Sequence, residues 1–329
     1  MDKGFILQLE TVPDIYGGEA HSLLEQRTEN GAKRRFGKID IAIKNRLAYE
    51  LELIYATNTA KLFLHWSDVI AKIKQKTYPY IYSVHNCSLV AFCLGVTEVN
   101  PFQTDSCFER LLNRRSTNVP VLFFEVPKGK GAEIWEHLKA EENVLIDIGE
   151  NPALSDFPTD EVSVFFEKKS YSDKRLLYRA AVKAGIGEMS GISAPESIEQ
   201  LADLLAYRRN AEFTNKDPVF LYQENAVGLL VKAGLSFEEG EGLRRAFARK
   251  NSSEINFYYN IFRKKAKSAG LSEDKAAAVF SVVERQINFT VCRASYVAMA
   301  QYLYMDTYFK KGIDAYVCKK ADARTFWGI

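Results

Sequence analysis

The chain has 329 residues, of which 47% are hydrophobic and 26% are charged. This length suffices for two ordinary domains, and the composition excludes a fibrous or mainly disordered chain. No apolar run reaches the roughly 18 residues that a transmembrane helix needs, and the acidic N-terminus does not resemble a secretory signal. The five cysteines are scattered without a CxxC pair, which argues against a disulfide framework or a structural zinc site. We expect a cytoplasmic protein with reduced thiols and no membrane partner.

The formal net charge of +2 conceals an asymmetry along the chain. From Arg244 onward there are 16 Lys and Arg residues against 7 Asp and Glu, whereas the preceding part has 28 against 35. A basic C-terminal part suggests a polyanionic partner such as DNA. The alternative is an ordinary set of solvated, lysine-rich helix faces.

The first 150 residues mix helical and extended patterns. Residues 45–57 have apolar side chains at helical spacing, which predicts an amphipathic helix. The apolar run 88–95 fits a buried helix or a strand, because periodicity alone cannot separate the two. Residues 119–126 are β-branched and aromatic between turn signals, which predicts a strand, and 143–148 predict a second one.

From about residue 195 onward the pattern is mainly helical. Ser193 is a candidate N-cap for the first of these helices. Helical segments are predicted at 197–209, 223–234, 237–250, 255–270, 272–286 and 294–311. The last of them carries an aromatic stripe, which we interpret as core packing, with a surface for stacking nucleobases as the alternative.

Six segments, in collinear order, resemble the alpha subunit of bacterial DNA polymerase III, the C-family replicative polymerase. They are RLAYELELI (46–54), SLVAFCLGVTEVNPF (88–102), FERLLNRR (108–115), ESIEQLADLLAYRR (196–209), VFLYQENAV (219–227) and LSFEEGEGLRRAFARK (235–250). The resemblance implies an α+β fold with a reduced, nucleotidyltransferase-like palm at residues 1–150. A mainly helical, fingers-like region at 151–329 would follow, basic from about residue 244.

The catalytic positions of this family are altered in the chain. Two-metal nucleotidyl transfer needs paired carboxylates, which the family places in a strand PDxDxDF directly after FERFLN. Here the aligned positions are Phe123 and Glu125, and a third family aspartate corresponds to Asp147. Glu125 and Asp147 are weak metal candidates, and strand-edge acids facing water are the alternative. We therefore expect no catalytic residues and no cofactor. Mg²⁺ would be implied only if Glu125, Asp147 and a neighbour such as Asp105 or Glu109 rebuilt a metal site.

The triphosphate-binding loop is altered as well. The family has GRGS before SLVA, whereas the chain has Ile81, Tyr82, Ser83 and Val84, without glycine or a basic residue. Only about twenty residues join the two candidate strands, so we expect no thumb. The family's N-terminal phosphoesterase domain and its C-terminal clamp-binding parts are also not recognised. The resemblance thus points to a truncated and degenerate member.

The fingers-like region keeps its basic positions. The expected nucleic-acid-binding residues are Arg208, Arg244, Arg245, Arg249, Lys250, Arg263, Lys264 and Lys265. The function expected is non-catalytic binding of DNA, or of a replication or repair protein. The alternatives are an active DNA-directed polymerase with a rebuilt metal site and a replisome adaptor without DNA affinity.

Overall fold

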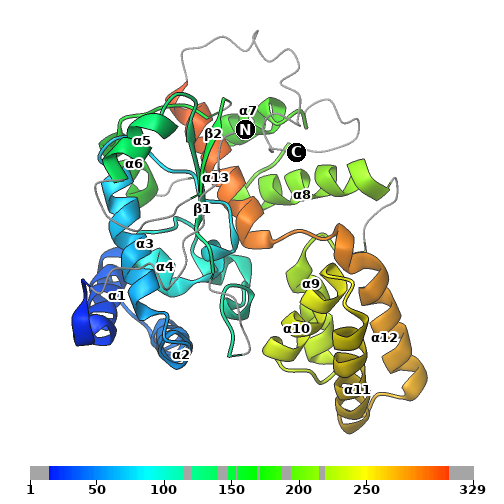
Figure 1. Ribbon diagram of the computed structural model, residues 1–329. Coiled ribbons are helices and arrows are strands. Elements are labelled where there is room, and N and C mark those ends of the chain that lie inside the picture. Colours follow the sequence, from blue (N-terminus) through cyan, green and yellow to red (C-terminus); the bar gives the residue numbers. More distant parts are fainter. Residues whose placement is uncertain are drawn as a thin grey trace.

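The computed structural model describes residues 15–114, 120–138, 147–152, 154–168, 171–186, 194–214 and 219–310. Within these ranges the protein is mainly helical, with one small parallel sheet (Figure 1). The predicted α+β class is therefore confirmed at this coarse level. No helix in the described ranges is both long and apolar enough to cross a bilayer.

Four helices form the N-terminal part, and two of them begin at side-chain caps. They are α1 (Ala20–Phe36), α2 (Ile41–Ala56), α3 (Ala60–Ile73) and α4 (Leu89–Cys93). Asp40 caps α2 by accepting the Ile43 N–H, as an N-cap should. Ser88 caps α4 by accepting the Ala91 N–H, so the apolar run that was open from sequence is a short helix. Two 3₁₀ turns that matter below are η3 (Val84–Cys87) and η5 (Phe108–Arg110).

The two predicted strands pair with each other. β1 (Phe123–Pro127) and β2 (Asp147–Asn151) are parallel and connected through α5 (Gly131–Leu138), so they form a βαβ unit. Tyr80 adds an antiparallel bridge on the other side of β1 at Glu125. In the register of β1 and β2, Phe123 lies opposite Asp147 and Glu125 lies opposite Gly149.

A second helical group packs against the sheet side of the N-terminal part. It contains α6 (Thr159–Lys168), α7 (Lys174–Lys183), α8 (Ile198–Thr214) and α13 (Arg293–Phe309). Tyr302 and Tyr304 of α13 are 4% and 1% exposed, and their rings contact Tyr80 and Tyr171 among others. These two aromatic residues belong to the core, so the packing interpretation of the stripe is confirmed for them. Ser193, the predicted N-cap of α8, lies outside the described residues.

The remaining helices form a separate bundle, which we call the helical module (Figure 1). They are α9 (Gln223–Lys232), α10 (Phe237–Ala248), α11 (Ser252–Ser268) and α12 (Glu273–Gln286). α10 starts with a capping box, in which Ser236 and Glu239 satisfy each other's backbone N–H groups. Asn251 caps α11 and Ser272 caps α12, and in each case the one side chain accepts a hydrogen bond from a backbone N–H of the first turn. Short polar caps therefore define this module locally.

Three buried apolar clusters support these parts. The first joins α1–α5, the second joins α6–α8 with α13, and the third fills the helical module. Tyr78, Tyr80 and Cys87 from the N-terminal part also belong to the second cluster. The boundary expected near residue 150 falls inside β2, and the second cluster contains residues from both sides of it.

Candidate functional site

The sheet register brings the three aligned catalytic positions together. Phe123 and Glu125 are two residues apart on β1, and Asp147 of β2 is the direct partner of Phe123. The Phe123 side chain is half exposed and has no atom that could bind a metal. The side chain of Asp147 lies outside the described residues. The backbone thus places the three aligned positions close together, but of the two on β1 only Glu125 has a carboxylate.

The Glu125 carboxylate is held by two neighbouring side chains. The hydroxyl of Tyr82 and the Nδ2 of Asn151 both donate to Oε2, the latter at 2.9 Å. Burial, followed by the nearby Glu125 charge, raises the pKa of Tyr82 well above its ordinary value, so Tyr82 stays a neutral donor. The Oε2 oxygen of Glu125 is therefore engaged within the protein, whereas the strand-edge alternative supposed an acid that faces water.

Tyr82 belongs to the segment aligned with the triphosphate-binding loop. The Ile81 N–H donates to the hydroxyl of Tyr302 at 3.2 Å, and Asn86 donates to the carbonyl oxygens of Ile81 and Ser83. A phosphate cradle needs exposed, convergent N–H groups, which the family obtains with glycine. Here the segment is fixed against α13 and closed over Glu125 by the Tyr82 side chain.

The two neighbouring acids considered for a rebuilt magnesium site lie elsewhere. Asp105 is 83% exposed and pairs with Arg293 at 3.0 Å. Glu109 accepts a hydrogen bond from Tyr49 at 2.5 Å. Mg²⁺ needs several oxygen ligands around one point. Among the described side chains, Glu125, Asp105 and Glu109 do not converge on such a point, so they do not fit a two-metal centre.

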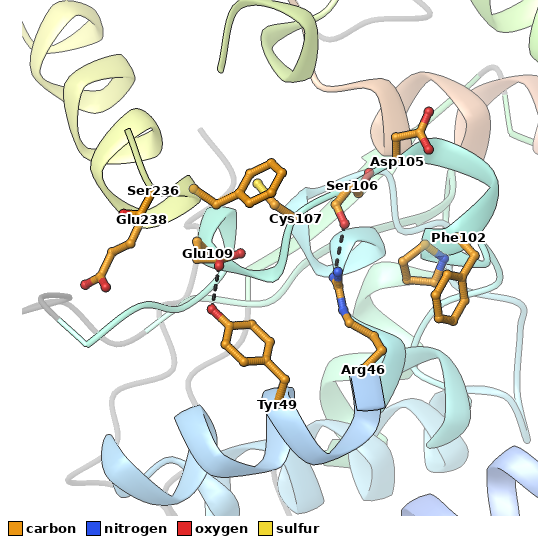
Figure 2. Close-up of a pocket in the computed structure, with 11 residues that line it drawn as sticks. Arg46, Tyr49, Phe102, Asp105, Ser106, Cys107, Glu109, Ser236 and Glu238 are labelled. Carbon is orange, nitrogen blue, oxygen red and sulfur yellow. Dashed lines mark hydrogen bonds between the residues drawn. The ribbon is translucent and has the colours of Figure 1, made fainter. Parts of the chain in front are cut away.

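Asp105 and Glu109 line a cleft of about 610 Å³ instead. Figure 2 shows Arg46 and Tyr49 on α2 facing the segment that carries Ser106 and Glu109. The N-terminus of α10, with Ser236 and Glu238, closes the other side. Arg46 is engaged with Glu50 and with the carbonyl oxygens of Cys87 and Ser106. The cleft lies between the N-terminal part and the helical module, and none of the aligned catalytic positions lines it.

Three of the eight expected DNA-binding residues are partly buried by their internal contacts. Arg244 donates to both carboxylate oxygens of Glu241. Arg245 donates from Nη2 to the carbonyl oxygens of Glu109 at 2.7 Å and Arg110 at 2.9 Å. Arg208 donates to the carbonyl oxygen of Ala184. Arg245 thus links α10 to the segment around η5 and Arg208 links α8 to the end of α7, whereas Arg244 pairs within α10.

The other five lie on the surface of the helical module. Lys265 pairs with Glu239 at 2.7 Å, and Arg263 pairs with Glu273. Arg249, Lys250 and Lys264 are exposed, and none of the described acids pairs with their side chains. They are the expected residues best placed for phosphate contacts. The DNA-binding role of all eight stays a prediction.

A buried ionic cluster, not expected from sequence, lies between η5 and the helical module. Arg110 donates to Gln223 and lies 3.7 Å from Glu224 and 3.9 Å from Glu241. Its side chain is only 4% exposed. Burial, assisted by the neighbouring Cys292, raises the pKa of Glu224 to about 8, although Arg110 opposes the shift. The cluster joins the FERLLNRR segment to the two segments that begin α9 and α10.

The same region contains a convergent group of possible metal ligands. Cys87, Glu224 and Cys292 place their ligand atoms within 4.8 Å of one another, and no other such group of three occurs among the described residues. Sequence spacing gave no signal, because the three residues are separated by more than sixty positions. The usable signal was indirect and incomplete, since Cys87 directly precedes one segment compared with the polymerase and Glu224 lies in another, whereas Cys292 lies in none of them.

Comparison with known families shows what the N-terminal part of the chain is similar to. Residues 22–141 match the family described as Bacterial DNA polymerase III alpha NTPase domain. The matched range covers α1–α5 and β1, and thus includes η3, η5 and the aligned positions Phe123 and Glu125. Three of the six segments, at 46–54, 88–102 and 108–115, lie within this match, so the predicted resemblance is confirmed for this part of the chain.

Individual relatives extend the similarity. The chain is 33% identical over 120 residues to an error-prone DNA polymerase of Burkholderia mallei, covering 36% of this chain and 11% of that protein. It is 30% identical over 135 residues to the DNA polymerase III subunit alpha of Bacillus subtilis, covering 40% and 12%. A 22% identity to the same subunit of Treponema pallidum spans 379 aligned residues, 97% of this chain and 32% of that protein. The chain thus spans between about a tenth and a third of the length of these relatives.

Proposed function

We propose that this is a DNA polymerase III alpha-like protein that has lost polymerase catalysis and binds DNA in a replication or repair setting. In this proposal residues 1–150 are the palm-like region and 151–329 the fingers-like region, with α9–α12 as its DNA-facing part. The observation that carries the loss of catalysis is the hydrogen bond from Tyr82 to Glu125.

This hydrogen bond matters because it joins the two altered motifs. In the polymerase resemblance, the loop bearing Tyr82 would hold the triphosphate and the strand bearing Glu125 would hold Mg²⁺. Two-metal catalysis requires carboxylate oxygens free to bind cations about 3.5–4 Å apart. Glu125 instead accepts from Tyr82 and Asn151, and Phe123 stands at the neighbouring catalytic position. Among the side chains that the structure describes, neither the metals nor the triphosphate finds the groups that it needs.

DNA binding is supported by the surface cations of the helical module. Arg249 and Lys250 follow α10, and Lys264 lies in the last two turns of α11. Exposed Lys and Arg bind phosphates by displacing counterions, which makes the affinity salt-dependent and tolerant of sequence. No membrane contact is proposed.

The test is fluorescence anisotropy of the purified chain with labelled single-stranded and primer–template DNA, first in EDTA and then in Mg²⁺. We expect binding in both conditions and at least a tenfold weakening between about 50 and 200 mM salt. The triple variant Arg249→Glu, Lys250→Glu, Lys264→Glu should abolish binding. Lys38→Glu is the matched control, since Lys38 is an exposed cation outside the helical module.

Primer extension in the same samples separates the alternatives. We expect no nucleotide incorporation with Mg²⁺ or Mn²⁺. Incorporation that disappears in Glu125→Gln would contradict the loss of catalysis and favour a rebuilt metal site. Absence of DNA binding in every condition would instead favour a protein adaptor of the replisome.

A further inference from the structure

Three side chains from distant parts of the chain meet where the helical module joins the rest of the protein. Cys87 ends η3, Glu224 lies in the first turn of α9, and Cys292 immediately precedes α13. Their ligand atoms lie within 4.8 Å of one another, and the two sulfur atoms are 3.8 Å apart. The group thus connects the N-terminal part to the two segments through which the chain enters and leaves the helical module.

The sulfur–sulfur distance favours one kind of chemistry. A disulfide bond is only about 2.05 Å long. Two thiolates bound to a tetrahedral Zn²⁺ at about 2.3 Å each lie about 3.8 Å apart, which is the edge of that tetrahedron. The observed 3.8 Å equals this edge, so Cys87 and Cys292 could bind zinc together without moving apart, and the same distance lets one thiol donate to the other.

The backbone holds the second and third ligands in place. Gln223 N–H donates to the carbonyl oxygen of Val291 at 2.9 Å, and Val291 N–H donates to that of Leu221 at 3.1 Å. This short parallel pairing places Glu224 and Cys292 at neighbouring ends of two extended segments. The Arg293 N–H also donates to Oε2 of Glu224 at 3.1 Å, which fixes the carboxylate. The group is therefore supported by hydrogen bonds in the way that metal ligands usually are.

One oxygen of this group is buried without a partner. The Glu224 side chain is 6% exposed, and its Oε1 accepts no hydrogen bond within the part of the chain that the structure describes. The nearest cation is Nε of Arg110 at 3.7 Å, which is beyond hydrogen-bond distance. A buried carboxylate oxygen without a partner is costly. A cation bound between Glu224 and the two sulfurs would supply what this oxygen lacks.

We propose that Cys87, Glu224 and Cys292 bind a thiophilic divalent cation, with Zn²⁺ as the best match. Thiolate ligands select zinc over Mg²⁺ or Ca²⁺, which prefer oxygen alone. Two thiolates and one carboxylate carry three negative charges, which Zn²⁺ and the guanidinium of Arg110 together neutralise. Three protein ligands leave the fourth tetrahedral position to water or to another small ligand.

The position of the site indicates its role. The bound ion would tie η3 to the starts of α9 and α13, next to the Arg110 cluster that already joins them. It would therefore fix the helical module against the N-terminal part, and its loss would loosen that contact. The proposal concerns metal binding alone and does not depend on DNA binding.

The test uses the full chain, purified under reducing conditions without chelator. Competition between the protein and a chromogenic zinc indicator measures affinity and stoichiometry, and Co²⁺ reports the ligands by its absorption. We expect one Zn²⁺ per chain and, with Co²⁺, a thiolate-to-cobalt charge-transfer band together with tetrahedral d–d bands. Zn²⁺ should also raise the thermal unfolding temperature.

Matched variants locate the ion. Cys87→Ser, Cys292→Ser and Glu224→Gln should each weaken zinc binding by at least about tenfold. Losing a residue that only supports a metal ligand already costs about that much affinity, so losing a ligand should cost no less. Cys93→Ala is the control, because Cys93 is a buried thiol of α4 outside this group. Circular dichroism of each variant checks folding. If a cysteine variant does not fold, Glu224→Gln and the cobalt spectrum of the unaltered protein still test whether the metal binds at this group.

Two results would overturn the proposal. One is the absence of zinc or cobalt uptake by the reduced, folded protein, in which case peptide mapping for a Cys87–Cys292 disulfide would show whether the pair is a redox couple. The other is unchanged uptake in Cys292→Ser, which would place the ion elsewhere.

Discussion

Arg245 of α10 donates from Nη2 to the backbone carbonyl oxygen of Glu109 at 2.7 Å, although the two residues are 136 positions apart. A second hydrogen bond from the same nitrogen reaches the carbonyl oxygen of Arg110 at 2.9 Å. Both carbonyl groups belong to η5, whose turn ends there and leaves them without helical partners. One guanidinium thus attaches the helical module to the segment that precedes β1.

Replacing Arg245 by Gln should therefore reduce stability. Hydrogen bonds from a charged donor each contribute about 1.5–3 kcal/mol, and a shorter side chain cannot reach both carbonyl oxygens. We expect a loss of about 2 kcal/mol in the free energy of unfolding, measured by urea denaturation. Arg249→Gln, one turn later and exposed, should leave stability unchanged but weaken DNA binding. Equal stability of the two variants would contradict a role for Arg245 in attaching the helical module.

A glycine in α1 allows close packing of two helices. A Cβ atom at Gly31 would lie 1.9 Å from the carbonyl oxygen of Cys93, whereas one at Gly228 in α9 would meet nothing within 4 Å. Gly31→Ala should therefore destabilise the protein by about 1–3 kcal/mol or more, because α1 must move away from α4. Gly228→Ala should instead stabilise it by up to about 1 kcal/mol through helix propensity. Thermal unfolding of both variants compares these opposite signs directly.

The ion pairs of Glu98 hold α1 and α3 to the segment after α4. Its carboxylate is bound by Arg35 at 2.6 Å and Lys74 at 3.1 Å, and it is 6% exposed. Glu98→Gln should cost about 3–5 kcal/mol, since two partly buried cations lose their anion. The exposed pair between Glu52 and Arg114 provides the control, and Glu52→Gln should cost less than about 1 kcal/mol. Urea denaturation at neutral pH measures both.

The pKa of the Glu98 carboxyl predicts how part of the protein's stability changes in acid. Burial alone raises the pKa of Glu98, but Lys74 and Arg35 outweigh burial and lower it to about 2, from an ordinary 4.5. A depressed carboxyl pKa means that the unfolded chain takes up the proton first. The stability that this carboxylate provides should be complete above pH 4.5 and decline as the pH falls toward 2. In Glu98→Gln this part of the acid response should be missing.

The pKa of His65 in α3 predicts a second change in stability, at milder pH. Burial lowers the pKa of His65 to about 4 from 6.5, so the folded protein keeps the ring neutral while the unfolded chain protonates it. Stability should then fall as the pH drops below 6.5. Between about pH 7.5 and 5 the wild-type protein should lose about 2 kcal/mol more than His65→Leu. Parallel pH profiles of the two proteins would refute the neutral, buried state of this ring.

Much of the local structure could be predicted from the sequence. The helical spacing at 45–57, the β-branched run at 119–126 and the helical patterns at 237–250, 255–270 and 272–286 led to α2, β1 and α10–α12, because these signals act over a few residues. The run at 88–95 remained open between helix and strand. Only the cap at Ser88, in contact with the buried Glu50, makes it α4.

Among the expected site residues, sequence determined what was missing but not what the remaining groups do. The resemblance implies that Phe123 stands where the family has a catalytic carboxylate, since the residue at an aligned position can be read directly. It could not show that Tyr82 and Asn151 bind Glu125, or that Arg244 and Arg245 face inward while Arg249 faces outward. Cys87, Glu224 and Cys292 converge only through tertiary structure. Local propensity is a property of neighbouring residues, whereas a site is made by packing segments that are distant in sequence, and only the folded chain decides which side chains meet.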